Sequence, residues 1–111
     1  MPAESLTMES LPGQAEGSRI LRLTGPLTLS SLFDFQNTLR ADPPPLLILD
    51  LTGVPYMDSA GMGAIINYFV FCQRHGHKLV VAGVTPRVME LFTMTKVDSL
   101  LTMVPSAADV S

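Results

Sequence analysis

The chain has 111 residues, a length typical of one domain, because two separate cores would each be too small to be stable unaided. Hydrophobic residues make up 47% of the chain and charged residues 15%, which excludes wholesale disorder. The net charge is -3 and the seven lysines and arginines are scattered, so no direct nucleic-acid partner is indicated. We expect one domain over residues 1–111, with its core in 18–104 and loose ends at 1–5 and 106–111.

Three features of the sequence favour a cytoplasmic protein without membrane insertion. The longest apolar stretch, residues 60–72, is interrupted by glycines and polar residues and is too short to cross a hydrocarbon core. Glu4 and Glu9 stand where a signal peptide would need positive charge. Cys72 is the only cysteine, so the chain can form neither an intramolecular disulfide nor a cysteine-based metal cluster. We expect Cys72 to be a small apolar residue within a helix.

The N-terminal part of the chain predicts a β-hairpin. Residues 6–10 alternate weakly between apolar and polar side chains, and residues 18–24 form a clearer strand. Between them, Pro12-Gly13 and Gly17 can reverse the chain, and Gly25-Pro26 can end the second strand in a turn.

The next segment predicts a helix and then a central strand. Ser30 or Ser31 can cap a helix, and the proline run at residues 43–45 prevents its continuation. The apolar residues that recur near helical spacing are Leu32, Phe35 and Leu39. Residues 46–49 form a continuous apolar run, which is typical of a strand covered on both faces.

The second predicted helix starts at Ser59 and stops at Gly76. Its expected apolar face follows the i, i+3, i+4, i+7 pattern and consists of Met62, Ile65, Ile66, Phe69 and Val70. A strand at residues 78–82, a helix from Pro86 to about Met94, and a final strand at residues 100–104 follow. This order predicts an α/β fold: a small mixed sheet with parallel central strands, an N-terminal hairpin and helices packed on it.

The run from Asp58 to Gly63 lies where a helix should begin, after the predicted central strand. Ser59 can serve as the N-cap of that helix, with Asp58 complementing its dipole. The same position can also accommodate a phosphate on Ser59, because a helix N-terminus offers unpaired N–H groups, and the two interpretations are compatible. Gly61 and Gly63 each cost about 1 kcal/mol of helix propensity relative to alanine, so we expect a close approach to the backbone there. Packing within the chain is the preferred explanation for Gly63, and a partner protein is the alternative.

Residues 56–65, YMDSAGMGAI, resemble the signature of STAS domains, especially those of bacterial anti-sigma factor antagonists. Residues 23–27 are similar to the strand and turn of that family, residues 47–51 to its central strand, and residues 78–92 to its later strand and helix. The resemblance covers residues 19–104. It implies the STAS fold and a binding function.

The resemblance also implies a regulatory site. In this family a serine directly after an aspartate, here Ser59 after Asp58, is phosphorylated by an anti-sigma factor with serine kinase activity, and the unmodified form binds that kinase. A phosphatase is an expected further partner. Thr28 stands where the family commonly has an acidic residue, and residues 107–111 cannot supply the longer C-terminal helix of the family. The expected partner-binding residues are Asp58, Ser59, Ala60, Gly61, Met62, Gly63 and Thr28.

Two enzyme classes fit the sequence poorly. A dinucleotide fold would need a third glycine where Ile66 stands and an acidic residue where the strand at residues 78–82 ends, at Gly83. A serine hydrolase would need a base beside Ser59, but His75 lies about 24 Å away along the helix. His75 and His77 are better explained as loop residues than as a metal pair. We therefore expect no enzyme activity, no cofactor and no metal.

A second role remains open within the same fold. STAS modules also serve as subunits of transporters, lipid-transport complexes and stress-signalling assemblies, where they act by protein binding without a phospho-switch. Three methionines could form an adaptable partner surface, although core filling by these flexible side chains is preferred. They are Met89, Met94 and Met103.

Overall fold

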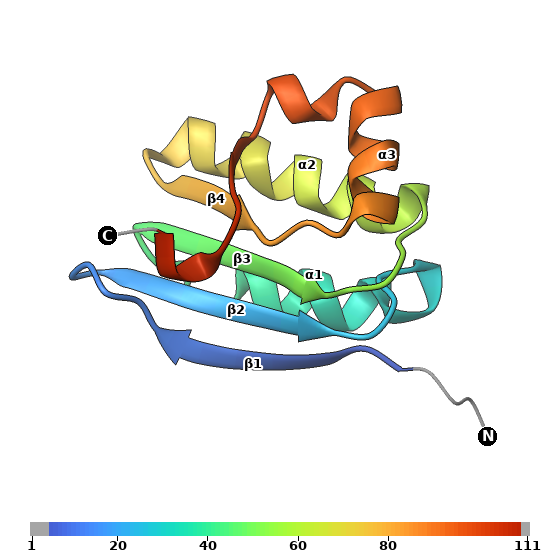
Figure 1. Cartoon of the computed structure of the whole chain (residues 1–111). Coiled ribbons are helices and arrows are strands. Elements are labelled where there is room, and N and C mark those ends of the chain that lie inside the picture. Colours follow the sequence, from blue (N-terminus) through green and yellow to red (C-terminus); the bar gives the residue numbers. More distant parts are fainter. Residues whose placement is uncertain (1–4, 110–111) are drawn as a thin grey trace.

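The computed structural model describes residues 5–109, and across them the chain forms helices packed on a five-stranded sheet (Figure 1). The strands are β1 (Thr7–Pro12), β2 (Ser18–Thr24), β3 (Leu46–Gly53), β4 (Lys78–Ala82) and β5 (Thr102–Val104). The helices are α1 (Leu32–Arg40), α2 (Ser59–His75) and α3 (Pro86–Met94). Short 3-10 turns occur at η1 (Leu29–Ser31), η2 (Val97–Ser99) and η3 (Ala107–Asp109).

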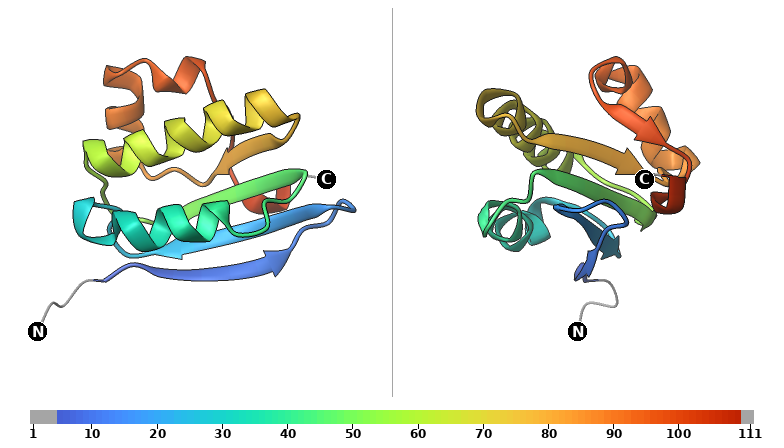
Figure 2. Two further views of the ribbon diagram at one scale, coloured as in Figure 1. Left: turned by 180° about the vertical axis from the view of Figure 1, so that it is seen from behind. Right: turned by 90° about the vertical axis from the view of Figure 1, so that its left-hand side faces the viewer.

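The sheet confirms the predicted mixed α/β topology. β1 and β2 pair antiparallel, which makes the N-terminal hairpin, whereas β2, β3, β4 and β5 pair parallel in chain order. Leu21, Leu49 and Val81 lie side by side in register across the three central strands. Each parallel step requires a crossover helix, and Figure 2 shows α1 and α2 side by side on one face of the sheet. The turn η3 lies on the opposite face, next to β3.

The central strand β3 is buried on both faces, as its uniform apolar run predicts. Leu47, Leu49 and Leu51 belong to the main core beneath the helices. The alternate residues Ile48 and Asp50 point to the other face and are only 1% and 5% exposed. Other parts of the domain therefore pack against both faces of β3.

Asp50 is the buried charged residue of this sheet within residues 5–109. Its Oδ1 accepts hydrogen bonds from the Thr52 amide (3.0 Å) and hydroxyl (2.6 Å), and its Oδ2 accepts one from Arg22 Nε at 3.2 Å. Burial on its own would raise the pKa of this carboxyl, but the Thr52 hydrogen bonds and the Arg22 guanidinium together lower the pKa below its ordinary value. Asp50 is therefore ionised, and its ion pair with Arg22 links β3 to the neighbouring strand β2.

The bounds of α2 agree with the prediction, but its buried face differs. Gly76 ends the helix in the left-handed conformation (φ 73°), as expected for a glycine stop. The expected core residue Val70 is 41% exposed, whereas Tyr68, which looked like a polar interruption, is 6% exposed. The buried residues are Gly61, Met62, Ala64, Ile65, Tyr68 and Cys72. The helix carries apolar side chains nearly all round, so periodicity alone could not choose the face that meets the core.

The C-terminal part departs from the sequence prediction in two places. The last strand begins at Thr102, because η2 occupies residues 97–99 and leaves Leu100 56% exposed. Residues 106–111 were expected to be loose, but Ala107–Asp109 form the turn η3. The expectation for residues 1–5 falls mostly outside the described residues. None of the helices in the described part of the chain is both long enough and apolar enough to cross a membrane.

Candidate functional site

The candidate site lies at the carboxyl ends of β2 and β3, where the chain turns into α1 and α2. Two loops meet there, at the right-hand end of Figure 1. Leu27 and Met57 form a short parallel bridge between them, the Leu27 amide donates to the Tyr56 carbonyl, and the Asp58 amide donates to the Leu27 carbonyl, both at 3.2 Å. These backbone bonds join residues about thirty positions apart into one rigid surface.

Asp58 caps α2 and also holds the neighbouring loop. Its Oδ1 accepts a hydrogen bond from the Gly61 amide, and its Oδ2 accepts one from the Leu29 amide, both at 3.0 Å. Burial on its own would raise the pKa of Asp58, but the hydrogen bonds donated by Gly61 and Leu29 outweigh it and lower the pKa. The expectation that Ser59 is the N-cap is therefore wrong. A carboxylate has two oxygens, and Asp58 uses one for each element.

Ser59 is the first residue of α2 and is exposed. Within residues 5–109 its hydroxyl has no hydrogen-bond partner. Ala60, the next residue, is half-buried. Because Asp58 performs the capping, the Ser59 hydroxyl stays free on the surface and accessible to another protein.

The two glycines of the first turns of α2 have different surroundings. A Cβ on Gly61 would lie 2.5 Å from the Leu27 carbonyl oxygen and 2.8 Å from Leu27 Cγ, so only glycine fits without movement. A Cβ on Gly63 would have nothing within 4 Å among the described residues. The expected internal packing is therefore found at Gly61, and the expectation of packing at Gly63 is wrong. Gly63 leaves the helix backbone open on the side away from Leu27.

Thr28 and Met62, the remaining residues expected at the site, differ in accessibility. Thr28 is half-buried, and its hydroxyl shares a hydrogen bond with the Ser30 hydroxyl at 3.0 Å. Met62 is 6% exposed and its Sδ accepts from the Thr95 hydroxyl at 3.2 Å, so its side chain belongs to the core. Ser31 stands at the N-cap of α1, as expected, but its side chain makes no cap bond and instead approaches the Pro26 and Thr28 carbonyls.

Sequence reasoning missed two exposed apolar residues beside the site. Leu29 is 68% exposed and its amide bonds Asp58, while Phe33 lies one turn further along and is 73% exposed. Phe33 lies off the apolar face of the predicted first helix, and that position was a signal that could have located it, whereas Leu29 precedes the predicted helix. Leu29 therefore adds an exposed apolar side chain beside Asp58, and Phe33 adds another one turn further along α1.

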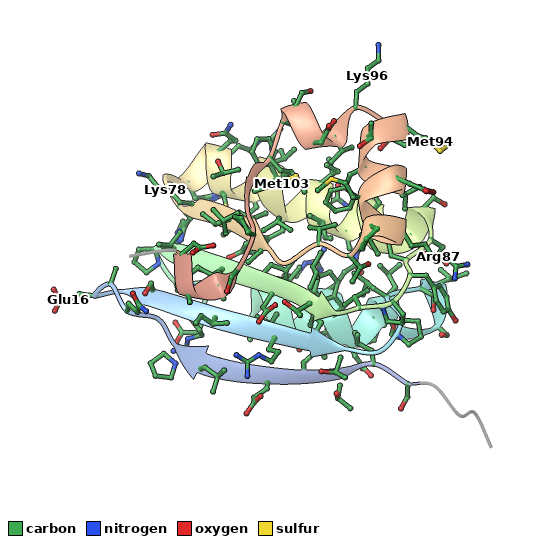
Figure 3. All side chains as sticks on the ribbon, viewed as in Figure 1. Glu16, Lys78, Arg87, Met94, Lys96 and Met103 are labelled. Atoms are coloured by element: carbon green, nitrogen blue, oxygen red, sulfur yellow. The ribbon has the colours of Figure 1, made fainter. Side chains whose placement is uncertain are left out.

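The positively charged side chain of Arg87 also lies near this end of the molecule. The Arg87 guanidinium stands over the Tyr56 ring, 5.2 Å from its centroid, and Figure 3 shows Arg87 at the right-hand end of the molecule, at the base of α3. The Thr85 hydroxyl donates to the Val54 carbonyl at 3.1 Å, which ties the start of α3 to the loop before α2.

The methionines show a mixed outcome. Met89 and Met103 pack partly against the core, as expected, but Met94 is 81% exposed and projects from α3 in Figure 3. Core filling is therefore wrong for Met94. Cys72 is buried within α2, as predicted, and burial raises the pKa of its thiol.

Comparison with known proteins identifies the family. The STAS domain model matches residues 11–110, so the chain belongs to the STAS domain family. The anti-sigma-B factor antagonist of Listeria monocytogenes serovar 1/2a is 34% identical over 56 residues, which cover 50% of this chain and 49% of that protein. The aligned region thus spans about half the length of this curated relative.

Solved structures show the same fold at low sequence identity. An anti-sigma factor antagonist from Mycobacterium paratuberculosis has a TM-score of 0.78 at 18% identity, over 95% of this chain and 90% of that one. A sulfate transporter family protein from Wolinella succinogenes has a TM-score of 0.75 at 22% identity, over 85% and 83%. One architecture therefore occurs in proteins of two different roles.

Proposed function

We propose that this chain is an anti-sigma factor antagonist that acts by binding, without enzyme activity of its own, in the cytoplasm. Its partner is an anti-sigma factor with serine kinase activity, which it binds while Ser59 is unmodified. Phosphorylation of Ser59 ends binding, and a phosphatase restores it. The name of the Listeria relative and the family of the chain support this proposal.

The observation that carries the proposal is the free, exposed hydroxyl of Ser59 beside a helix cap that Asp58 already provides. Because Asp58 provides the cap, the Ser59 hydroxyl makes no bond within residues 5–109 that a kinase would have to break. Here a kinase can modify the hydroxyl while the bonds from Asp58 to Gly61 and Leu29 remain. The modification therefore changes the surface and leaves the fold intact.

The surroundings of Ser59 explain why a phosphate would prevent binding. The open backbone at Gly63 and the exposed apolar side chains of Leu29 and Phe33 suit a close, partly apolar contact. A phosphate adds about 1.5 to 2 negative charges beside the ionised Asp58. A partner would have to desolvate that combined charge or meet it with like charge, and both reduce affinity.

The experiment compares unmodified chain, Ser59→Ala and Ser59→Asp. The partner is recovered from source cells with tagged unmodified chain, and binding to each form is measured by titration calorimetry. Ser59→Ala should hold the partner as tightly as unmodified chain, and Ser59→Asp should bind weakly, with circular dichroism showing both folded. Incubation with the partner and ATP should add one phosphate at Ser59. Equal binding by both variants, or phosphate at Thr28, Ser30 or Ser31 instead, would refute the switch.

The likeness to the Wolinella protein supports a second candidate, a STAS subunit of a transport complex. In that case the partner would be a membrane-complex subunit and its binding would not depend on Ser59. A partner recovered equally well by Ser59→Ala and Ser59→Asp, and without kinase activity, would favour this candidate over the phospho-switch.

A further inference from the structure

Arg87 lies in the first turn of α3, at the same end of the molecule as Ser59. β3 and β4 are parallel neighbours, so α2 and α3, which follow them, begin at the same edge of the sheet (Figure 1). The Thr85 hydroxyl donates to the Val54 carbonyl at 3.1 Å and fixes the start of α3 against the loop that leads to Ser59. The first turn of α3 is therefore next to that loop, and Arg87 contacts it at Tyr56.

The Arg87 guanidinium is held by a contact that it can exchange for a stronger one. It stands 5.2 Å from the centroid of the Tyr56 ring, and the residue is exposed. Within residues 5–109 it makes no ion pair, although Glu90 lies one turn further along the same helix. A cation over an aromatic ring is a weak interaction at an exposed site, whereas a phosphate accepts two parallel charge-assisted hydrogen bonds from one guanidinium. A phosphate within reach therefore draws Arg87 away from the ring.

A phosphate on Ser59 is placed to do this. Tyr56 stands three residues before Ser59, and three extended residues span at most about 11 Å. The side chains of arginine and phosphoserine are both long and flexible, so together they can close that distance. The Asp58 carboxylate already accepts from the Gly61 amide, so a phosphate cannot take that amide without displacing the helix cap. Its charge of about 1.5 to 2 negative units needs another donor, and Arg87 offers one from the neighbouring helix start.

We propose that Arg87 is a positioning residue for a phosphate on Ser59. After modification its guanidinium leaves the Tyr56 ring and pairs with the phosphate, which ties the starts of α2 and α3 together. The guanidinium cancels only one unit of charge, so the surface beside Asp58 stays anionic and still disfavours the partner. The inference rests on the proposed phosphorylation of Ser59 and adds the residue that holds its product.

The experiment replaces Ser59 by phosphoserine during translation, so it needs neither the kinase nor the partner. Four full-length chains carry the phosphate: the parent, Arg87→Gln, Arg87→Lys and the control Lys96→Gln. The control removes the same charge beyond the other end of α3, where Figure 3 shows Lys96 projecting away from Arg87. A phosphorus-31 NMR titration gives the second pKa of the phosphate in each chain. Proton NMR gives the shifts of the Arg87 side chain in the parent, with and without the phosphate.

The phosphate pKa should respond to Arg87 and not to the control. A cation beside the phosphate favours its dianion, so Arg87→Gln should raise that pKa by about 0.5 unit. Arg87→Lys keeps the charge without the planar fork and should raise it by less, whereas Lys96→Gln should leave it unchanged because solvent and salt screen the longer distance. The carboxylates near the helix starts are common to all four chains and cancel in this comparison. They are those of Asp34, Asp58 and Glu90.

The Arg87 side chain reports its own movement. In the unmodified chain its protons lie over the Tyr56 ring and carry a ring-current shift, which should be lost in the phosphorylated chain. Loss of that shift together with the pKa change in Arg87→Gln supports the pairing.

Three results would overturn it. They are an unchanged phosphate pKa in Arg87→Gln, an equal change in Lys96→Gln, and a ring-current shift that persists after phosphorylation. In each case the guanidinium acts on the phosphate from a distance or not at all. Failure of the cognate kinase to modify Ser59 would instead refute the proposed function, and it would not alter these measurements on the chain that carries phosphoserine.

Discussion

Replacing Gly61 and Gly63 separately by alanine tests whether the Leu27 loop really packs against the start of α2. Both changes gain up to about 1 kcal/mol of helix propensity. Only the Gly61 variant places its methyl 2.5 Å from the Leu27 carbonyl oxygen and 2.8 Å from Leu27 Cγ. Leu27 is fully buried and its backbone is bonded on both sides, so its carbonyl has little room to retreat. The steric cost should be about 1–3 kcal/mol, typical of overpacking.

The difference between the two variants isolates this steric cost, because the propensity gain is common to both. Gly63→Ala should be as stable as the parent chain or up to about 1 kcal/mol more stable. The unfolding free energy of Gly61→Ala should be about 1–3 kcal/mol lower than that of Gly63→Ala. For a domain of this size each kcal/mol corresponds to about 4 °C in melting temperature, so the two variants should melt about 4–12 °C apart.

Thermal and urea unfolding followed by circular dichroism measure the difference, and equal m-values would confirm that both variants unfold from comparable native states. If Gly61→Ala proves as stable as Gly63→Ala, the contact with Leu27 does not exist in solution and the described geometry of the site is wrong. Under the proposed function, Gly63→Ala should keep the fold but weaken binding of the partner, because the added methyl stands on the open side of the helix.

Asp50→Asn should make the unfolding free energy depend less on pH in the acid range. The lowered pKa of Asp50 contributes stability that is present above its ordinary pKa of 3.8 and is lost as pH falls through the lower folded-state pKa. In urea titrations at decreasing pH, the parent chain should therefore lose stability more steeply than the variant. Asp58→Ala removes the helix cap and the bond from Leu29, so the unfolding free energy should fall by about 1–2 kcal/mol, and a negligible fall in denaturant titrations would contradict the double hydrogen bond. Cys72 should react with an aromatic disulfide reagent only as fast as the chain opens, and immediate labelling of the native protein would show that the thiol is accessible. Phe33→Ser should change the unfolding free energy by less than about 0.5 kcal/mol yet weaken partner binding in calorimetry, and unchanged binding would exclude Phe33 from the interface.

Local signals in the sequence were enough for most of the fold. The apolar run at residues 46–49 predicted the buried strand β3, and Gly76 and Pro86 marked one helix end and one helix start. These signals act on the backbone of their own residue or on its immediate neighbours. They hold whatever the rest of the chain does, so the order of strands and helices and the parallel crossovers could be predicted without tertiary information.

The same locality explains the errors within α2. A helix with apolar residues on most of its circumference has no single favoured face, so the burial of Tyr68 and the exposure of Val70 depended on where α1 and the sheet lay. The prediction that Ser59 caps the helix failed for a related reason. Sequence preference ranks serine and aspartate nearly equally as caps. The structure has Asp58 as the cap, and its second carboxylate oxygen also accepts from the Leu29 amide, a contact that capping preference does not include.

The sequence by itself thus determined the family motif, the site of the helix start and the candidate serine, all within ten consecutive residues. Tertiary structure decided which groups at that site are free: the Ser59 hydroxyl, the open side of Gly63, and the exposed Leu29 and Phe33. It also decided that Gly61 must be glycine, through a contact with Leu27, thirty-four positions earlier in the chain. Periodicity and capping preferences reflect interactions between residues close together in the sequence, whereas exposure and close backbone approach depend on which distant segments pack against the helix.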